Sequence, residues 1–159
     1  MISYRPVVCL LLLPLQVACA GDAHSEQAAM EIEFRHISHA QTCVGNWRVR
    51  VAESGEVFHA RNVEHCPKGE IWSAPYPAEP SHRLSAWERW RLWRKIPVEE
   101  LFTLTEHITD PARATMGGSR EEVELTDGAR HHQIVVENTS NEAVTAVKEA
   151  LQTYAQLGP

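Results

Sequence analysis

The sequence has no internal repeat, no excess of positive charge and no apolar run long enough to cross a membrane. A membrane-spanning helix needs about 20 apolar residues, so the apolar run at 7–17 is too short to be one. Acidic residues outnumber lysine and arginine by 21 to 15. Because nucleic-acid-binding domains usually carry a basic surface, this balance argues against nucleic acid as a partner.

Signatures of catalysis are also missing. The chain has no G-x-S-x-G motif and no Ser/His/Asp set at a supporting spacing. Gly117-Gly118 lacks the Lys-Ser/Thr that follows in a phosphate-binding loop. The acidic pairs Glu99-Glu100 and Glu121-Glu122 are typical of solvated faces. We therefore expect a protein that is not an enzyme and that uses no cofactor.

The N-terminus is typical of a secretory signal peptide. Arg5 supplies the positive charge, residues 7–17 the apolar core and Ala18-Cys19-Ala20 the cleavage signal. Ala18-Cys19 also matches the bacterial lipobox, although Gln16 stands where an apolar residue is usual. Cys19 is therefore a candidate lipidation site. A periplasmic protein and a membrane-anchored lipoprotein both stay open, with a lipid anchor as the only expected membrane contact.

The chain divides into three parts. We expect a signal peptide at 1–20, a flexible leader at 21–29 and a single domain at 30–157. Removing the signal peptide leaves 14 lysines and arginines against 21 acids, a net charge of about −7. Within the domain, residues 64–83 contain four prolines and no periodicity, which predicts a long loop.

The segment between Cys43 and Cys66 predicts a disulfide-stapled hairpin. Residues 47–51 alternate in polarity, and Ser54-Gly55 is a turn dipeptide. A two-residue turn would place Cys43 directly opposite Cys66. The oxidising compartment of an exported protein favours a disulfide between them. The same register would put Trp47, Val49, Val51, Phe58 and Ala60 on one face, and Arg48, Arg50, His59 and Arg61 on the other.

Capping and turn signals predict the remaining elements. Residues 30–35 alternate like a strand. Ser85 and Glu88 form a capping box that begins a helix at about 86–95, and a further helical turn can follow Pro97.

In the C-terminal third, Asp127-Gly128 predicts a turn between strands 121–125 and 130–137, with Thr126 paired to Ala129. Thr139 and Glu142 predict the start of a final helix. Its buried face would carry Val144, Val147, Leu151 and Tyr154.

These elements predict an α+β domain. An N-terminal strand is followed twice by a hairpin and a helix, which gives an antiparallel sheet of about five strands. Two amphipathic helices would cover one face of this sheet.

The expected helix at 86–95 carries tryptophans at every third position among arginines. Trp87, Trp90 and Trp93 could pack against the sheet, with the arginine stems around them. Alternatively, they could form a surface that binds anionic envelope components. Both interpretations stay open, and the candidate binding residues are Trp72, Tyr76, Trp87, Trp90, Arg91 and Arg94.

A metal site is not expected. His36 and His39 are the nearest candidates, beside Cys43. Strand positions three apart point to opposite faces, however, and the thiol of Cys43 is assigned to the disulfide.

The hairpin resembles an uncharacterised family of small exported bacterial domains, many of them candidate lipoproteins. The similarity covers about residues 31–155 and continues through Phe102-Thr103-Leu104, Thr109-Asp110-Pro111 and the turn before the last helix. In the hairpin it lies on Trp47, Val49, Val51, Gly55, Val57 and Phe58. The chain departs from the family where Cys-Pro should precede the aromatic residue, because Gly45-Asn46 stands there and Cys43 is shifted. The proline-rich segment also looks like an insertion. The family has no assigned activity, so the resemblance implies a fold and no residue roles.

The leading functional hypothesis is a non-enzymatic exported envelope protein that binds a protein or another envelope component. One alternative is a periplasmic metal-binding protein. Another is an inhibitor of a lysozyme or protease that presents Trp72 and Tyr76 from its stapled loop. The sequence does not indicate an oligomeric state.

Overall fold

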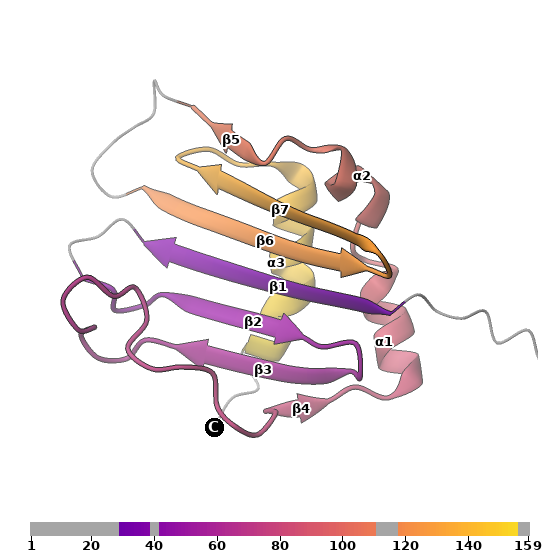
Figure 1. The fold of residues 1–159 in the computed structure, drawn as a ribbon, viewed down its shortest axis with the longest axis horizontal. Coiled ribbons are helices and arrows are strands. Elements are labelled where there is room, and N and C mark those ends of the chain that lie inside the picture. The colour runs from indigo at the N-terminus through magenta and orange to yellow at the C-terminus, as the bar shows by residue number, and fades with distance from the viewer. Residues whose placement is uncertain (1–28, 39–41, 111–117, 156–159) are drawn as a thin grey trace, which may run out of the picture.

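The described residues form a mixed α+β fold, with one seven-stranded sheet and three helices on one of its faces (Figure 1). The computed structural model describes residues 29–38, 42–110 and 118–155. The expected signal peptide, Cys19 and nearly all of the leader lie outside the described residues. No helix in the described ranges is long and apolar enough to cross a membrane.

The sheet has the strand order β4-β3-β2-β1-β6-β7-β5. Every neighbouring pair is antiparallel except β5 and β7, which are parallel. The strands are β1 (Met30–Ser38), β2 (Trp47–Val51), β3 (Glu56–Arg61), β4 (His82–Arg83), β5 (His107–Thr109), β6 (Ser119–Asp127) and β7 (Arg130–Glu137). The helices are α1 (Ala86–Trp93), α2 (Val98–Thr103) and α3 (Glu142–Ala155).

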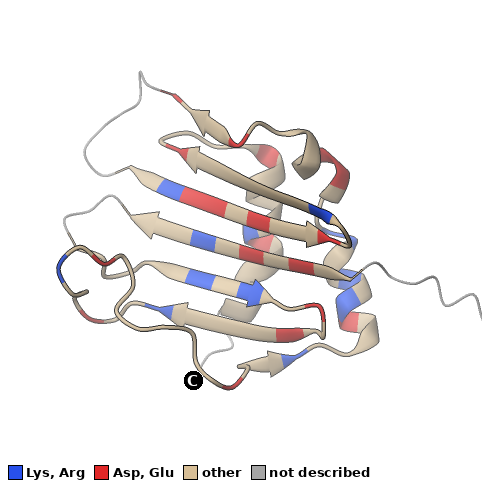
Figure 2. Cartoon of the chain, in the orientation of Figure 1, with Lys and Arg blue, Asp and Glu red and all other residues tan. Residues whose placement is uncertain are grey.

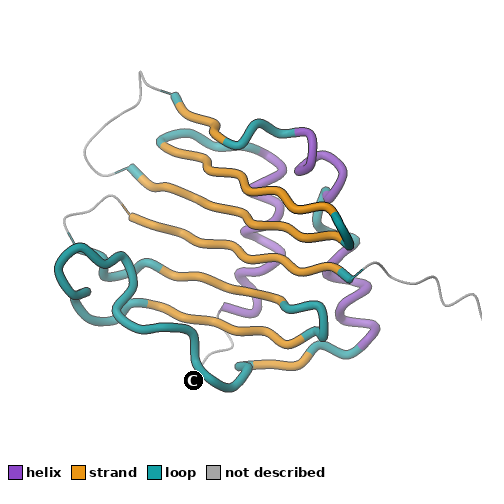
Figure 3. The backbone as a smooth tube through the Cα atoms, viewed as in Figure 1, coloured by secondary structure: helices purple, strands orange, loops and turns teal. Residues whose placement is uncertain are grey.

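The expected architecture is confirmed in its class, while the sheet is larger than expected. Strands β4 and β5 have two and three residues, too few to produce a periodic signal. The helical turn after Pro97 is a separate short helix, α2. Figure 3 shows the long loop between β3 and β4 at the opposite end of the sheet from α1.

The predicted register of the first hairpin is wrong by one residue. Ala52 N donates to Glu56 O at 2.9 Å, so the loop has three residues rather than two. Its last residue, Gly55, has a φ of 87°, the left-handed conformation that such loops require. Val51 therefore pairs with Val57, and both are fully buried.

The shift inverts the predicted faces of β3, because strand side chains alternate. Phe58 and Ala60 pair with Arg50 and Arg48 and share the open face of the sheet with them. His59 lies on the helix-covered face opposite Val49. Arg61 pairs with Trp47 on that same face, so the expected positions of Phe58, Ala60, His59 and Arg61 are all corrected.

The Cys43–Cys66 disulfide is confirmed, with a Cα–Cα distance of 6.0 Å. The predicted register made the two cysteines directly opposed partners on paired strands, and this is wrong. They lie in loops beyond the strand ends. There Gly45 N donates to Asn62 O, and Asn62 N donates to Asn46 O, both at 2.9 Å.

In the second hairpin the strand pairing is shifted by two residues from the predicted register, yet each side chain points to the predicted face of the sheet. Asp127 pairs with Arg130 around Gly128-Ala129. A slip of two residues preserves side-chain direction, so Val123, Leu125, Ile134 and Val136 are buried together as predicted.

Helix α3 forms as predicted and packs its apolar face on the sheet. Val144, Val147 and Leu151 are fully buried, and Tyr154 packs at the edge of the core. Asn141, rather than Thr139, caps the first turn by accepting from Val144 N at 3.2 Å.

Candidate functional site

Helix α1 is held in place by its first turn and by one side of the helix. The predicted capping box is confirmed: Glu88 N donates to Ser85 Oγ at 3.3 Å, and Ser85 N donates to Glu88 Oε2 at 2.8 Å. Leu92 is 2% exposed and joins the core. Arg89 lies along Gly55 and donates to Glu53 O at 3.3 Å. The helix therefore docks on the hairpin and leaves its other side to solvent.

The outward side of α1 carries two exposed tryptophans. Trp87 is 59% exposed and Trp90 is 44% exposed, whereas Trp93 packs against the core. The interpretation that all three tryptophans pack on the sheet is thus right for Trp93 and wrong for Trp87 and Trp90. Leu92 takes the central core position because the helix is rotated from the orientation that the tryptophan spacing favours.

Two arginines lie on the exposed rings. The Arg91 guanidinium is 4.4 Å from the Trp87 ring centroid, and that of Arg94 is 4.8 Å from the Trp90 ring centroid. Within the described ranges, no carboxylate oxygen lies within 4 Å of Arg91, Arg94 or Lys95. An otherwise acidic protein therefore presents a local positive surface. We call Trp87, Trp90, Arg91 and Arg94 the α1 surface.

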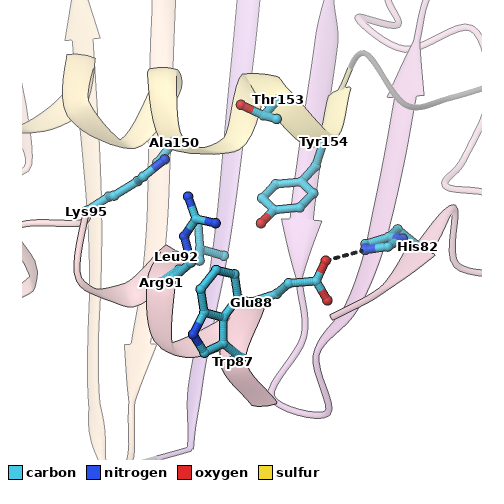
Figure 4. A pocket seen from close by; sticks show the side chains of 9 residues that line it. All are labelled: His82, Trp87, Glu88, Arg91, Leu92, Lys95, Ala150, Thr153 and Tyr154. Atoms are coloured by element: carbon cyan, nitrogen blue, oxygen red, sulfur yellow. Dashed lines mark ion pairs between the residues drawn. The ribbon is translucent and has the colours of Figure 1, made fainter. Parts of the chain in front are cut away.

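Beside the α1 surface, a cavity of about 300 Å³ lies between α1 and α3 (Figure 4). Arg91 from α1 and Lys95 from the turn after it extend toward α3 in this view. The side chains that line the cavity are His82, Trp87, Glu88, Arg91, Leu92, Lys95, Ala150, Thr153 and Tyr154.

The acidic and aromatic walls of this cavity are fixed by neighbours. Hydrogen bonds from Ser85, followed by His82, hold the pKa of Glu88 below its usual range. His82 Nε2 is 3.5 Å from Glu88 Oε1, and its ring stacks on Tyr154 at a centroid distance of 6.1 Å. Burial and the nearby Glu88 carboxylate raise the pKa of Tyr154, so its hydroxyl keeps its proton.

The loop residues Trp72 and Tyr76 lie on the open face of the sheet, apart from the α1 surface. The Arg48 guanidinium lies 4.5 Å from the Trp72 ring centroid and 4.1 Å from that of Tyr76. Tyr76 also meets Phe58 edge-on at 6.4 Å. Burial and the Glu33 carboxylate raise the pKa of Tyr76. The predicted binding residues therefore separate into two groups, and both loop rings are half-buried.

Two buried asparagines anchor the proline-rich loop, and the sequence analysis did not predict their role. Asn46 is 0% exposed and Asn62 is 3% exposed, and both donate to Ile71 O, at 3.1 and 2.8 Å. Asn62 Oδ1 accepts from Ser73 N at 3.0 Å. Val44, Val63 and Ile71 are exposed around this anchor. The only sequence signal is an asparagine beside each end of the hairpin.

The acidic pair Glu121-Glu122 was expected on a solvated face, and this is wrong. β6 is an internal strand, so both side chains are enclosed by neighbours. Glu122 is 6% exposed, accepts a hydrogen bond from Arg35 at 3.1 Å and forms an ion pair with Arg120, whose Nε is 2.7 Å from Glu122 Oε1. Burial alone would raise the pKa of Glu121, but the nearby His36 and a hydrogen bond from Lys148 (2.6 Å) hold it below its usual range.

The open face of the sheet carries a band of such ion pairs. Figure 2 shows basic residues on β2 next to acidic ones on β1, and further acidic residues on β6, which flanks β1 on its other side. Arg35 contacts Glu33, Glu122 and Glu124, and Arg50 Nε is 2.9 Å from Glu31 Oε1. The charges on these strands are therefore largely paired with one another, unlike the cations of α1.

The histidine candidates do not form a cluster. His36 stacks on Trp47 at 6.0 Å and its Nδ1 is 3.5 Å from Glu121, while His39 lies outside the described residues. In the ranges that the structure covers, no group of three histidine, cysteine or acidic side chains is placed to hold a metal ion.

Comparison with models of known protein families finds no match to this chain, and a search of curated proteins finds no similar sequence. The resemblance at the hairpin therefore stays a prediction, and the functional argument depends on the geometry described above.

Proposed function

We propose that this protein is a non-enzymatic component of the bacterial envelope, exported to the periplasm or lipid-anchored, that binds a protein or envelope partner through the α1 surface. The exposure of Trp87 and Trp90 under stacked arginines carries the proposal. Tryptophan and arginine are the residues most enriched at the energetic centres of interfaces.

The α1 surface is suited to binding because it combines exposed apolar area with arginine side chains that are already fixed in position. Burying a large apolar side chain is worth about 1.5–3 kcal/mol, so two half-exposed indoles offer a substantial gain to a partner. Each arginine already lies on a ring. Less side-chain freedom is therefore lost on binding than for free arginines.

The disulfide supports the export part of the proposal. Disulfides persist mainly in oxidising compartments, and Cys43 and Cys66 are the cysteines that remain once Cys19 is removed or lipidated. Mass spectrometry of the mature N-terminus tests this part. Gly21 would indicate a cleaved soluble protein, and an acylated Cys19 would indicate a lipoprotein. An intact Met1 would contradict export.

Binding of the purified protein to isolated bacterial envelopes tests the surface. We expect Trp90→Ala and Arg94→Gln each to lower the affinity at least fivefold, measured by co-sedimentation. Val63→Ala is the matched control, because Val63 is 76% exposed and lies beside the hairpin anchor rather than on α1. The proposal fails if Trp90→Ala binds like the wild type. Loss of binding in Val63→Ala alone would move the surface to the stapled end.

A further inference from the structure

We infer that the cavity between α1 and α3 binds a single anionic group, a carboxylate or a phosphate, carried on a short apolar or aromatic body. The inference deepens the proposed function and rests on it only for the source of the group, which would belong to the envelope partner. The cavity has its own residues, Lys95, Thr153 and Tyr154, which the α1 surface does not include.

The size and lining of the cavity suit a small ligand group. Its volume of about 300 Å³ lies at the lower end for ligand pockets, which are typically about 300–1,000 Å³. Leu92 and Ala150 are buried and form an apolar part of the lining, and the rings of Trp87 and Tyr154 form aromatic parts. An apolar lining with a few convergent polar groups is the usual composition of a ligand site.

The charge inside the cavity selects an anion. Arg91 lies in the last turn of α1 and Lys95 in the turn that follows the helix, and both line the cavity. The one acidic side chain in the lining, Glu88, is already engaged by Ser85 and His82. Two cations therefore face the cavity without a carboxylate partner among the described residues, and an anion there would complement them.

Arg91 is also placed so that its hydrogen-bond donors remain available. Its guanidinium is held against the Trp87 ring through the π face, which uses none of its N–H groups. A planar guanidinium can then present two parallel N–H donors to a carboxylate or phosphate.

Tyr154 adds a neutral donor on the opposite wall. Its hydroxyl points into the cavity in Figure 4 and makes no hydrogen bond with the residues that the structure describes. Because the pKa of Tyr154 is raised, this hydroxyl keeps its proton and can donate a hydrogen bond to an anion.

An NMR titration of the purified protein tests the inference. The probes are benzoate, phenyl phosphate and benzyl alcohol, the last being a neutral molecule of similar shape. We expect both anions to shift the indole N–H signal of Trp87, assigned with Trp87→Phe, and to bind at least tenfold more tightly than benzyl alcohol. Whichever anion binds more tightly identifies the group as a carboxylate or a phosphate.

Variants separate a built site from general attraction. Arg91→Gln and Lys95→Gln should each lower benzoate affinity at least fivefold, and Tyr154→Phe should lower it about threefold. Arg94→Gln is the control, because Arg94 lies on Trp90 outside the cavity lining. Equal binding of benzyl alcohol, an unchanged affinity in Arg91→Gln, or the same loss in Arg94→Gln would each overturn the inference.

The two proposals fail separately. Envelope binding that depends on Trp90, with no saturable binding of the anions, leaves the proposed function and removes the anion site. Anion binding that depends on Arg91 and Lys95, without envelope binding, does the reverse.

Discussion

Gly55 connects the first hairpin to α1 at the level of a single residue. Its φ is 87°, and a Cβ built there would lie 2.8 Å from Arg89 Cδ and 3.2 Å from Leu84 O. A side chain at this position is therefore strained by the backbone conformation and also collides with the first turn of α1.

We accordingly expect Gly55→Ala to lower the free energy of unfolding by about 2–3 kcal/mol, measured by urea denaturation. Gly128→Ala is the control: its φ is also positive, 58°, but a Cβ there would meet nothing within 4 Å. It should cost only about 1 kcal/mol. Equal losses in the two variants would mean that the contact with Arg89 is unimportant.

His59 should make stability depend on pH. Burial, followed by the charge of Arg61, lowers the pKa of His59 below its ordinary value of 6.5. The unfolded chain therefore binds a proton more readily than the folded one, so the stabilisation is complete above about pH 6.5 and is lost as the pH falls through the folded-state pKa.

The check is urea denaturation at pH 7.5 and pH 5.0. The wild type should be less stable at pH 5.0, and His59→Gln should narrow the difference. An unchanged difference in His59→Gln would assign the pH dependence to other groups.

At the scale of elements, the capping box decides how firmly α1 is held. Ser85→Ala removes the acceptor for Glu88 N and one partner of the Glu88 carboxylate, and it should cost about 1 kcal/mol of stability. Ser140→Ala is the control, because Asn141 caps α3 instead, and it should change stability by less than about 0.5 kcal/mol. If Ser85→Ala and Ser140→Ala lower the free energy of unfolding by the same amount, the capping box of α1 does not contribute to stability as we expect.

The elements also show where sequence patterns suffice and where they do not. The apolar face of α3 and the shared face of Val123 and Ile134 follow from periodicity, because one orientation alone buries them. The rotation of α1 does not follow, since tryptophans and arginines both recur at helical spacing. In the first hairpin, a single extra loop residue was enough to invert the face of Phe58.

The binding site was predictable only in part for the same reason. Trp87, Trp90, Arg91 and Arg94 are close in sequence on one helix, so their proximity could be predicted. The cavity could not, because His82 and Tyr154 reach it from β4 and α3, and no local pattern reports that contact.

At the scale of the molecule, the disulfide closes the end of the sheet that carries the proline-rich loop. Its cysteines are 23 residues apart, and closing a loop of this size is worth about 3 kcal/mol. The Cys43→Ser/Cys66→Ser double variant should lose about this amount in urea denaturation. Asn62 Nδ2 is 3.2 Å from Cys66 Sγ. The chemical-shift differences between the double variant and the wild type should therefore be concentrated near Asn62 and Ile71, and the signals of α1 should be unchanged. Shifts that spread through α1 would show that the staple organises the whole fold.

Strand β1 occupies the centre of the sheet and pairs with β6 across 81 to 97 positions of the chain. Such distant pairing must wait for most of the polypeptide, and it slows folding. If the chain crosses a membrane from its N-terminus, β1 emerges early and can pair with β2, but its other edge has no partner on that side until β6 follows. For a chain exported in this way, the topology would delay closure of the sheet until the passage is nearly complete.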